Sequence, residues 1–216
     1  MNNSIDLVLN EIKKDALSNE DLQDLLNEQI QITKYSDINK LSHADQLFAR
    51  LGRGIVLYNW SPNEGHWVSL IKKGNVIEFY DPYGNTMEGL PDNIKIPEQI
   101  QDSNGMSDNI LGKIIKESGY TLLQKPERHQ TQIRDINTCG RHVALRLLLH
   151  NMSLLQYNQL MKKIKDEKID LDEFVGVLTE IMSGDVTLDQ LNSFSGSGIH
   201  VPHMSKQALE QFNCST

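Results

Sequence analysis

The chain has 216 residues, of which 38% are apolar, and this is enough for one substantial hydrophobic core. Its 21 Lys and Arg residues against 29 Asp and Glu residues give a net charge of −8. Because phosphate binding needs clustered positive charge, this balance argues against nucleic acid as an essential partner. No apolar run approaches the roughly 18 residues that cross a bilayer, and the N-terminus lacks a secretory pattern, so we expect a soluble intracellular protein without a membrane partner.

The N-terminal segment, residues 1–40, is predicted to be helical. Apolar residues recur at roughly helical spacing within residues 1–32, which indicates two short amphipathic helices. A helix is expected next over residues 42–51, because Ser42 and Asp45 resemble a capping box and two glycines follow.

Three strands are predicted to follow, over residues 54–60, 66–71 and 76–80, because these segments are rich in β-branched and aromatic side chains. Residues 72–75 form a hairpin turn between the last two strands. Beyond the hairpin we expect, in chain order, a connecting loop, a helix, a fourth strand, a buried helix and two amphipathic helices, over residues 85–106, 107–118, 120–124, 139–150, 153–167 and 170–182.

The candidate chemistry centres on a cysteine. Cys139 and Cys214 are the only cysteines, which excludes a disulfide framework and a four-cysteine zinc site. Cys139 lies at the expected start of the buried helix, where the partial positive charge of a helix N-terminus favours thiolate over thiol. A cysteine nucleophile needs a base and an orienting acceptor. His66 opens one predicted strand and Asp81 ends the next, so a hairpin would bring imidazole and carboxylate to the same end.

Each of these residues also has an ordinary structural interpretation. Cys139 alone fits a buried core thiol, His66 an edge histidine, and Asp81 a turn residue that accepts backbone N–H groups. Glu78 competes with Asp81 as the orienting carboxylate, although it lies inside its strand. His142, three residues after Cys139, would allow a metal pair, but no second cysteine lies near, and no metal is expected.

The joint pattern resembles a known family. The motifs Gly65-His66-Trp67, Tyr80-Asp81-Pro82-Tyr83-Gly84, Gln132 and Asn137-Thr138-Cys139-Gly140 occur in the order seen in the adenain and SUMO-protease clan of cysteine peptidases. The Asp-Pro-Tyr-Gly and Thr-Cys-Gly-Arg-His runs look most like the maturation proteases of large DNA viruses, virophages and related elements. Adenain has Glu where this chain has Asp81, so this position is closer to the SUMO-protease pattern. The resemblance covers roughly residues 40–150.

The resemblance implies an α/β (α+β), papain-like fold, in which a mixed, mainly antiparallel sheet packs on the buried helix that carries the nucleophile. We expect a catalytic domain over residues 41–183, and the Ser- and Gly-rich run at residues 193–198 indicates a partly flexible C-terminal tail over 184–216. Cys139 would attack a peptide carbonyl, His66 would transfer the proton, and Asp81 would orient His66. Gln132 would donate to the oxyanion, with Gln130 as a competing donor, and no cofactor is required. Trp67 would lie at the substrate or in the core.

The expected activity is that of a cysteine endopeptidase that processes capsid precursors at Gly-containing sites during virion maturation. This implies protein substrates, an activating peptide, and a location at the viral assembly site in the host cytoplasm and in the virion. The alternatives are an isopeptidase that removes ubiquitin-like modifiers, an acyltransferase with a related triad, and a non-catalytic binding module.

The C-terminal tail carries two further hypotheses. The run from Phe194 to Gly198 loosely resembles an adenain-type cleavage site, so self-processing near Ser197 is one interpretation and an ordinary linker the other. Cys214 resembles the cysteine of a regulatory peptide disulfide, or it is an unpaired thiol near the end of the chain.

Overall fold

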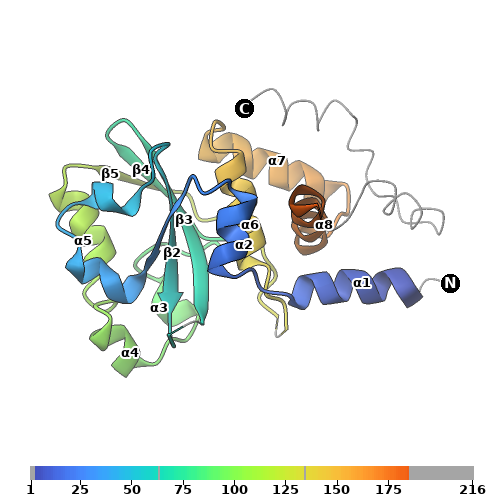
Figure 1. Cartoon of the computed structure of the whole chain (residues 1–216), viewed down its shortest axis with the longest axis horizontal. Helices are drawn as coiled ribbons and strands as arrows, with labels where there is room; N and C mark the ends of the chain where they lie inside the picture. The colour runs from blue at the N-terminus through green and yellow to red at the C-terminus, as the bar shows by residue number, and fades with distance from the viewer. Residues whose placement is uncertain (1–2, 63, 134, 185–216) are drawn as a thin grey trace.

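The computed structural model describes residues 3–62, 64–133 and 135–184 (Figure 1). In chain order the elements are α1 (Asn3–Lys14), α2 (Asn19–Leu25), β1 (Gln31–Lys34), η1 (Tyr35–Lys40), η2 (Ala44–Leu47), β2 (Arg53–Asn59), β3 (Gly65–Lys73), β4 (Val76–Tyr80), α3 (Leu90–Asn93), α4 (Glu98–Ser103), α5 (Ile110–Glu117), β5 (Thr121–Gln124), α6 (Cys139–Leu148), α7 (Leu154–Asp166) and α8 (Leu171–Ser183).

One five-stranded sheet organises the fold, with the strands in the order β1-β2-β3-β4-β5. The central strands β2, β3 and β4 pair antiparallel, whereas the edge strands β1 and β5 pair parallel to their neighbours. A two-residue turn with Gly74 at a φ of 59° joins β3 to β4, and glycine tolerates this left-handed conformation. The prediction of a mixed sheet is confirmed. Two of its four pairings are antiparallel and two are parallel, so the antiparallel character that was expected to dominate is confined to the centre of the sheet.

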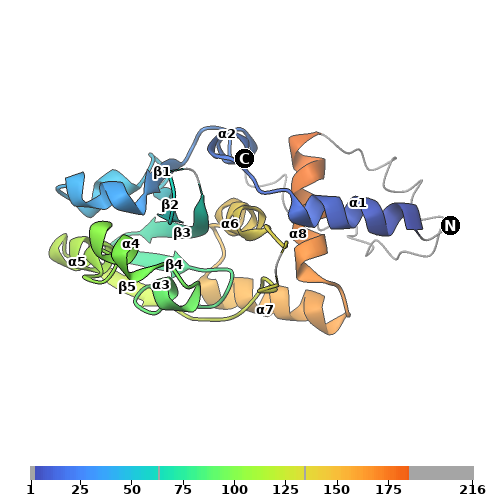
Figure 2. The same ribbon diagram turned by 90° about the horizontal axis from the view of Figure 1, so that it is seen from below.

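Alternating side chains of β2 and β3 divide the core between two faces of the sheet. Val56, Tyr58 and Val68 point into a cluster with η1, α3 and α5. Leu57 and Trp67 point to the opposite face, into a cluster with α2 and α6. Figures 1 and 2 show these helices on the two sides of the sheet. Buried on both faces, β2 reads as a continuous apolar run.

Helices α7 and α8 extend the molecule beyond α6. A third cluster joins Tyr80 at the end of β4 to Leu145 of α6 and Tyr157 of α7. Helix α1 crosses α8, as Figure 2 shows, and Ile12 packs so closely on Gly176 that an added Cβ would lie 2.7 Å from its Cγ2. Helix α1 thus packs on α8, whereas α2 contacts both α6 and α8.

Most elements agree with the sequence predictions, and three differ. The predicted helix over 42–51 is wrong: only the 3-10 turn η2 forms, capped by His43, because Phe48 turns the chain to extended backbone and Gly54 packs against the Leu47 carbonyl. The predicted loop over 85–106 contains α3 and α4, which start beside prolines. Strand β1 lies inside the segment predicted to be helical.

Candidate active site

The predicted base and carboxylate meet at one end of the β3–β4 hairpin. His66 is the second residue of β3 and Asp81 directly follows β4. The His66 Nε2 and Asp81 Oδ1 atoms are 2.5 Å apart, and the two side chains are 3% and 0% exposed. This contact fixes Nε2 against the carboxylate and leaves Nδ1 as the ring nitrogen available to a nucleophile.

The Asp81 carboxylate is held by the turn that follows it. Its Oδ1 accepts the Tyr83 backbone N–H at 3.1 Å, and its Oδ2 accepts both the backbone N–H and the side-chain amide of Asn85, at 2.8 and 2.7 Å. Asp81 was predicted to orient His66 or to cap a turn, and its two oxygens do both. The carboxylate is therefore fixed from two sides.

Cys139 is the first residue of α6 and is partly exposed. Burial, the largest single influence, lowers the pKa of His66, but the charge and hydrogen bond of Asp81 and the hydrogen bond and charge of Cys139 together raise it to about 10. The structure thus brings His66, Asp81 and Cys139 together from three separate elements. Since the imidazole is charged at neutral pH, it suits a thiolate partner.

Tyr83 is a site residue that the sequence analysis did not assign. Its ring stacks on the His66 imidazole with the centroids 4.4 Å apart and the planes inclined by 9°. Burial raises the pKa of the Tyr83 hydroxyl, and the negative charges of Cys139 and Asp81 raise it further, so the phenol stays protonated. The sequence feature that could have identified Tyr83 is an aromatic residue two positions after Asp81, because the tight turn that follows Asp81 brings this ring onto His66.

The two candidate oxyanion donors lie in different surroundings. The side chain of Gln132 is exposed, and its Nε2 donates to the Asn93 carbonyl at 3.3 Å. Gln130 is 1% exposed, and neither its Nε2 nor its Oε1 has a hydrogen-bond partner among the residues that the structure describes. The backbone of Gln130 is anchored next to Asp81, because its N–H donates to the Pro82 carbonyl.

The N-terminal segment contacts the start of α6. Trp67 is buried in the core cluster beneath α6, and its indole Nε1 donates to the Leu17 carbonyl at 3.3 Å. The backbone and side-chain N–H groups of Asn137, two residues before Cys139, donate to the Lys13 and Lys14 carbonyls. Trp67, predicted to bind substrate or pack in the core, contacts the core and this N-terminal segment in the described structure.

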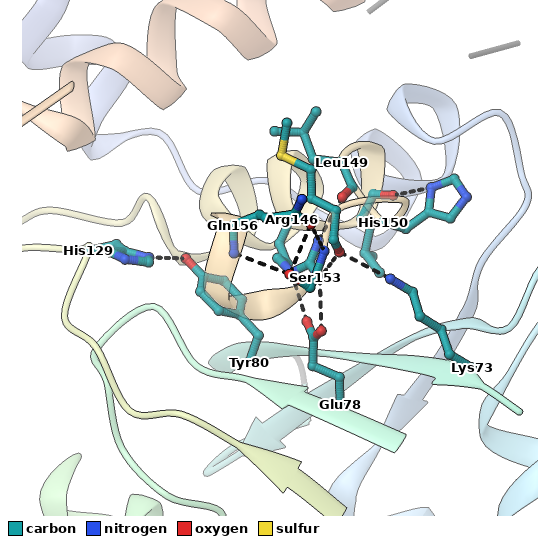
Figure 3. Close-up of polar contacts among 11 residues, drawn as sticks. Lys73, Glu78, Tyr80, His129, Arg146, Leu149, His150, Ser153 and Gln156 are labelled. Carbon is teal, nitrogen blue, oxygen red and sulfur yellow. Dashed lines mark hydrogen bonds and ion pairs between the residues drawn. The ribbon is translucent and has the colours of Figure 1, made fainter. Parts of the chain in front are cut away.

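Glu78, the competing carboxylate, is engaged elsewhere. Figure 3 shows it bound by Arg146 of α6, whose Nε and Nη2 donate to the two carboxylate oxygens at 2.7 and 2.9 Å. Arg146 also donates to the Leu149 and Met152 carbonyls, so this pair closes the turn between α6 and α7. Glu78 therefore secures α6 to the sheet, and of these two carboxylates it is Asp81 that contacts His66.

The remaining histidines near α6 do not gather around a metal position. His142 Nε2 lies 3.1 Å from Asp172, and His129 Nδ1 lies 3.1 Å from the Tyr80 hydroxyl (Figure 3). Burial lowers the pKa of His129 to about 3, with His142 and Lys165 lowering it further, so its ring is neutral. Among the described residues, no group of three or more His, Cys, Asp or Glu side chains is arranged to hold a metal ion.

The fold and the site together define a class: a mixed α/β protein with a buried His–Asp pair beside a cysteine at a helix N-terminus. The chain is 31% identical over 175 residues to the uncharacterized protein V9 of Sputnik virophage, an alignment covering 77% of this chain and 95% of V9. It belongs to the family of that virophage protein. The expectation of a viral protein agrees with this relationship.

Other comparisons add less. No protein-family model matches the sequence. The central domain of the uncharacterized Lpg1148 protein from Legionella pneumophila aligns with 79% of this chain and 99% of that domain, at 16% identity and a TM-score of 0.37. Within the described residues, no helix is both long and apolar enough to cross a membrane. The sites suggested near Ser197 and at Cys214 lie outside the described residues.

Proposed function

We propose that this protein is a cysteine endopeptidase with a papain-like arrangement, which cleaves viral precursor proteins at Gly-containing sites during virion maturation. The observation that carries the proposal is the convergence of His66, Asp81 and Cys139. His66 alone or Cys139 alone has an ordinary structural explanation, but a charged imidazole between a buried carboxylate and a partly exposed thiol has the form of an activated nucleophile. The virophage relative supports a role in a viral life cycle.

The chemistry follows from the positions of these groups. The Cys139 proton passes to His66 Nδ1 to form the resting ion pair, and the thiolate Sγ forms a bond to the substrate carbonyl carbon. When the tetrahedral intermediate collapses, the C–N bond breaks and His66 gives its proton to the leaving amine, which leaves the imidazole neutral. Water then gives a proton to the neutral His66 and its hydroxide to the acyl carbon. When this second intermediate collapses, the C–S bond breaks, which releases the acid and restores the thiolate beside the charged imidazole. Asp81 keeps the ring oriented throughout and stabilises its charged form.

The oxyanion needs donors next to the thiol. The Cys139 backbone N–H at the helix N-terminus is one, and a glutamine side chain is the second. The seven-residue spacing to Cys139 favours Gln132, whose amide would leave the exposed Asn93 carbonyl when substrate binds. Gln130 is the competitor, because its buried side-chain amide would lose no hydrogen bond to any described residue on turning toward the oxyanion.

The test is cleavage of native substrates. The full chain and its Cys139→Ala variant are incubated separately with the structural proteins encoded by the same genome, and new termini are identified by mass spectrometry. The proposal expects cleavage by the wild type alone, at sites that contain Gly. Release of a ubiquitin-like modifier from a conjugate, without precursor cleavage, would support the isopeptidase alternative instead. Absence of both activities, or equal cleavage by Cys139→Ala, would contradict a peptidase function.

A further inference from the structure

A second buried carboxylate lies behind the nucleophile. Asp172, in the first turn of α8, is fully buried. Its Oδ1 accepts the Thr138 hydroxyl at 2.5 Å and lies 3.1 Å from His142 Nε2, and its Oδ2 accepts the Thr131 backbone N–H at 2.9 Å. One side chain thus joins α8 to the residue before Cys139, to α6, and to the residue before Gln132.

These three contacts stabilise the negatively charged form of the Asp172 side chain. Burial alone raises the pKa of Asp172, but the hydrogen bond and charge of His142, then Thr138 and Thr131, lower it below its ordinary value. A buried carboxylate is retained at low cost only where several donors meet it. The charge of Asp172 also acts on Lys13 and Tyr83, which places it close to the site.

Thr138 is used in an unusual way. Thr at a helix N-cap normally turns its hydroxyl toward the first-turn amides, but the Thr138 side chain makes no capping bond. It points to Asp172 instead. The backbone N–H groups at the start of α6, beside the Cys139 thiol, therefore donate no hydrogen bond to the Thr138 side chain. Their partial positive charge stays available to a thiolate or an oxyanion.

We propose that Asp172 is a positioning residue of the active site, which fixes the Thr138–Cys139 turn and the Thr131–Gln132 segment relative to each other. The inference rests on the proposed function and extends it to α8, a helix outside the motifs that resemble peptidases. Errors of about 1 Å in the placement of a reacting group cost on the order of 10²-fold in rate, so such a clamp matters for chemistry as well as for folding.

The experiment measures the rate of Cys139 alkylation by iodoacetamide on the full chain at near-neutral pH, by peptide mass spectrometry. Thr138→Val keeps the shape of the side chain but removes the donor, and Thr138→Ser restores it. Thr179→Val is the matched control. Thr179 is also a buried threonine, but it lies on α8 and is hydrogen-bonded to Arg141 rather than to Asp172. Asp172→Asn and His66→Ala complete the set, and thermal unfolding checks that each variant is folded.

We expect Thr138→Val and Asp172→Asn each to slow Cys139 alkylation by about tenfold, with Thr138→Ser and Thr179→Val close to the wild type. If Asp172→Asn does not fold, the comparison of Thr138→Val with Thr138→Ser tests the proposal on its own. Wild-type rates in Thr138→Val, with slow alkylation in His66→Ala, would overturn the role of Asp172 and leave the peptidase proposal standing. Equal rates in His66→Ala and the wild type would overturn both.

Discussion

Two buried carboxylates lie three residues apart, Glu78 within β4 and Asp81 directly after it, and they have different roles. Glu78 binds Arg146, whose guanidinium also donates to two backbone carbonyl groups. All three guanidinium nitrogens and both carboxylate oxygens therefore have partners within the protein. Asp81 meets His66, a group that gains and loses a proton and that borders a partly exposed thiol. A buried ion pair can take part in a reaction when one of its partners can gain and lose a proton next to a solvent-accessible group. A buried pair without such a partner has a structural role.

The largest expected effect concerns the pair of His66 and Asp81. Asp81→Asn keeps an oxygen that can accept the backbone N–H groups of the turn, but it removes the negative charge that orients His66 and favours its protonated form. We expect kcat for precursor cleavage to fall on the order of 10⁴-fold, as for the equivalent Asp→Asn change in the Ser-His-Asp triad, with KM little altered. Steady-state kinetics on a Gly-containing peptide from the mapped cleavage site measures this. Near-wild-type kcat would show that Asp81 is only a turn residue.

The oxyanion donor is the next largest effect. Loss of one such donor costs on the order of 10² in kcat, so either Gln132→Ala or Gln130→Ala should show that loss. The motif spacing predicts Gln132, and the other variant then serves as its matched control. A larger loss in Gln130→Ala would transfer the role to the buried glutamine, and full activity in both would remove a glutamine from the mechanism.

The structural pair is tested by Glu78→Gln. The substitution leaves the buried Arg146 guanidinium without an opposite charge beside it, and such a loss costs about 3–5 kcal/mol of unfolding free energy. Urea unfolding followed by tryptophan fluorescence measures the loss. The fraction that remains folded should keep normal kcat, in contrast to Asp81→Asn. A stable but inactive variant would contradict the division between the two carboxylates.

The smallest effect is a pH dependence of stability. The pKa of His66 is raised to about 10, above the unfolded value near 6.5. The stabilisation by the His66 pair is therefore complete below about pH 6.5 and is lost as the pH rises through about 10. Wild-type stability should fall over this window, and Asp81→Asn should flatten the fall. An NMR titration that finds His66 neutral at pH 7.5 would contradict the ion pair.

The sequence predicts the parts of this site that depend on local patterns. A tight hairpin returns β4 beside β3, so the pairing of His66 with Asp81 follows from strand lengths, and the apolar run after Cys139 indicates its helix. Edge strand β1 was missed because its four residues, two of them polar at the ends, carry little strand signal. The glutamine amides and Asp172 depend on how a loop and a distant helix pack, and no local pattern encodes those contacts.

The most direct test of the central claim uses the two cysteines as each other's control. The full chain, His66→Ala and Cys139→Ala are treated with a peptide vinyl sulfone that ends in Gly, and the adducts are located by mass spectrometry. A cysteine peptidase forms one adduct, on Cys139, much faster than on Cys214, and this preference is lost in His66→Ala. Equal labelling of the two cysteines in the wild type, or labelling of Cys139 that does not depend on His66, would contradict the account.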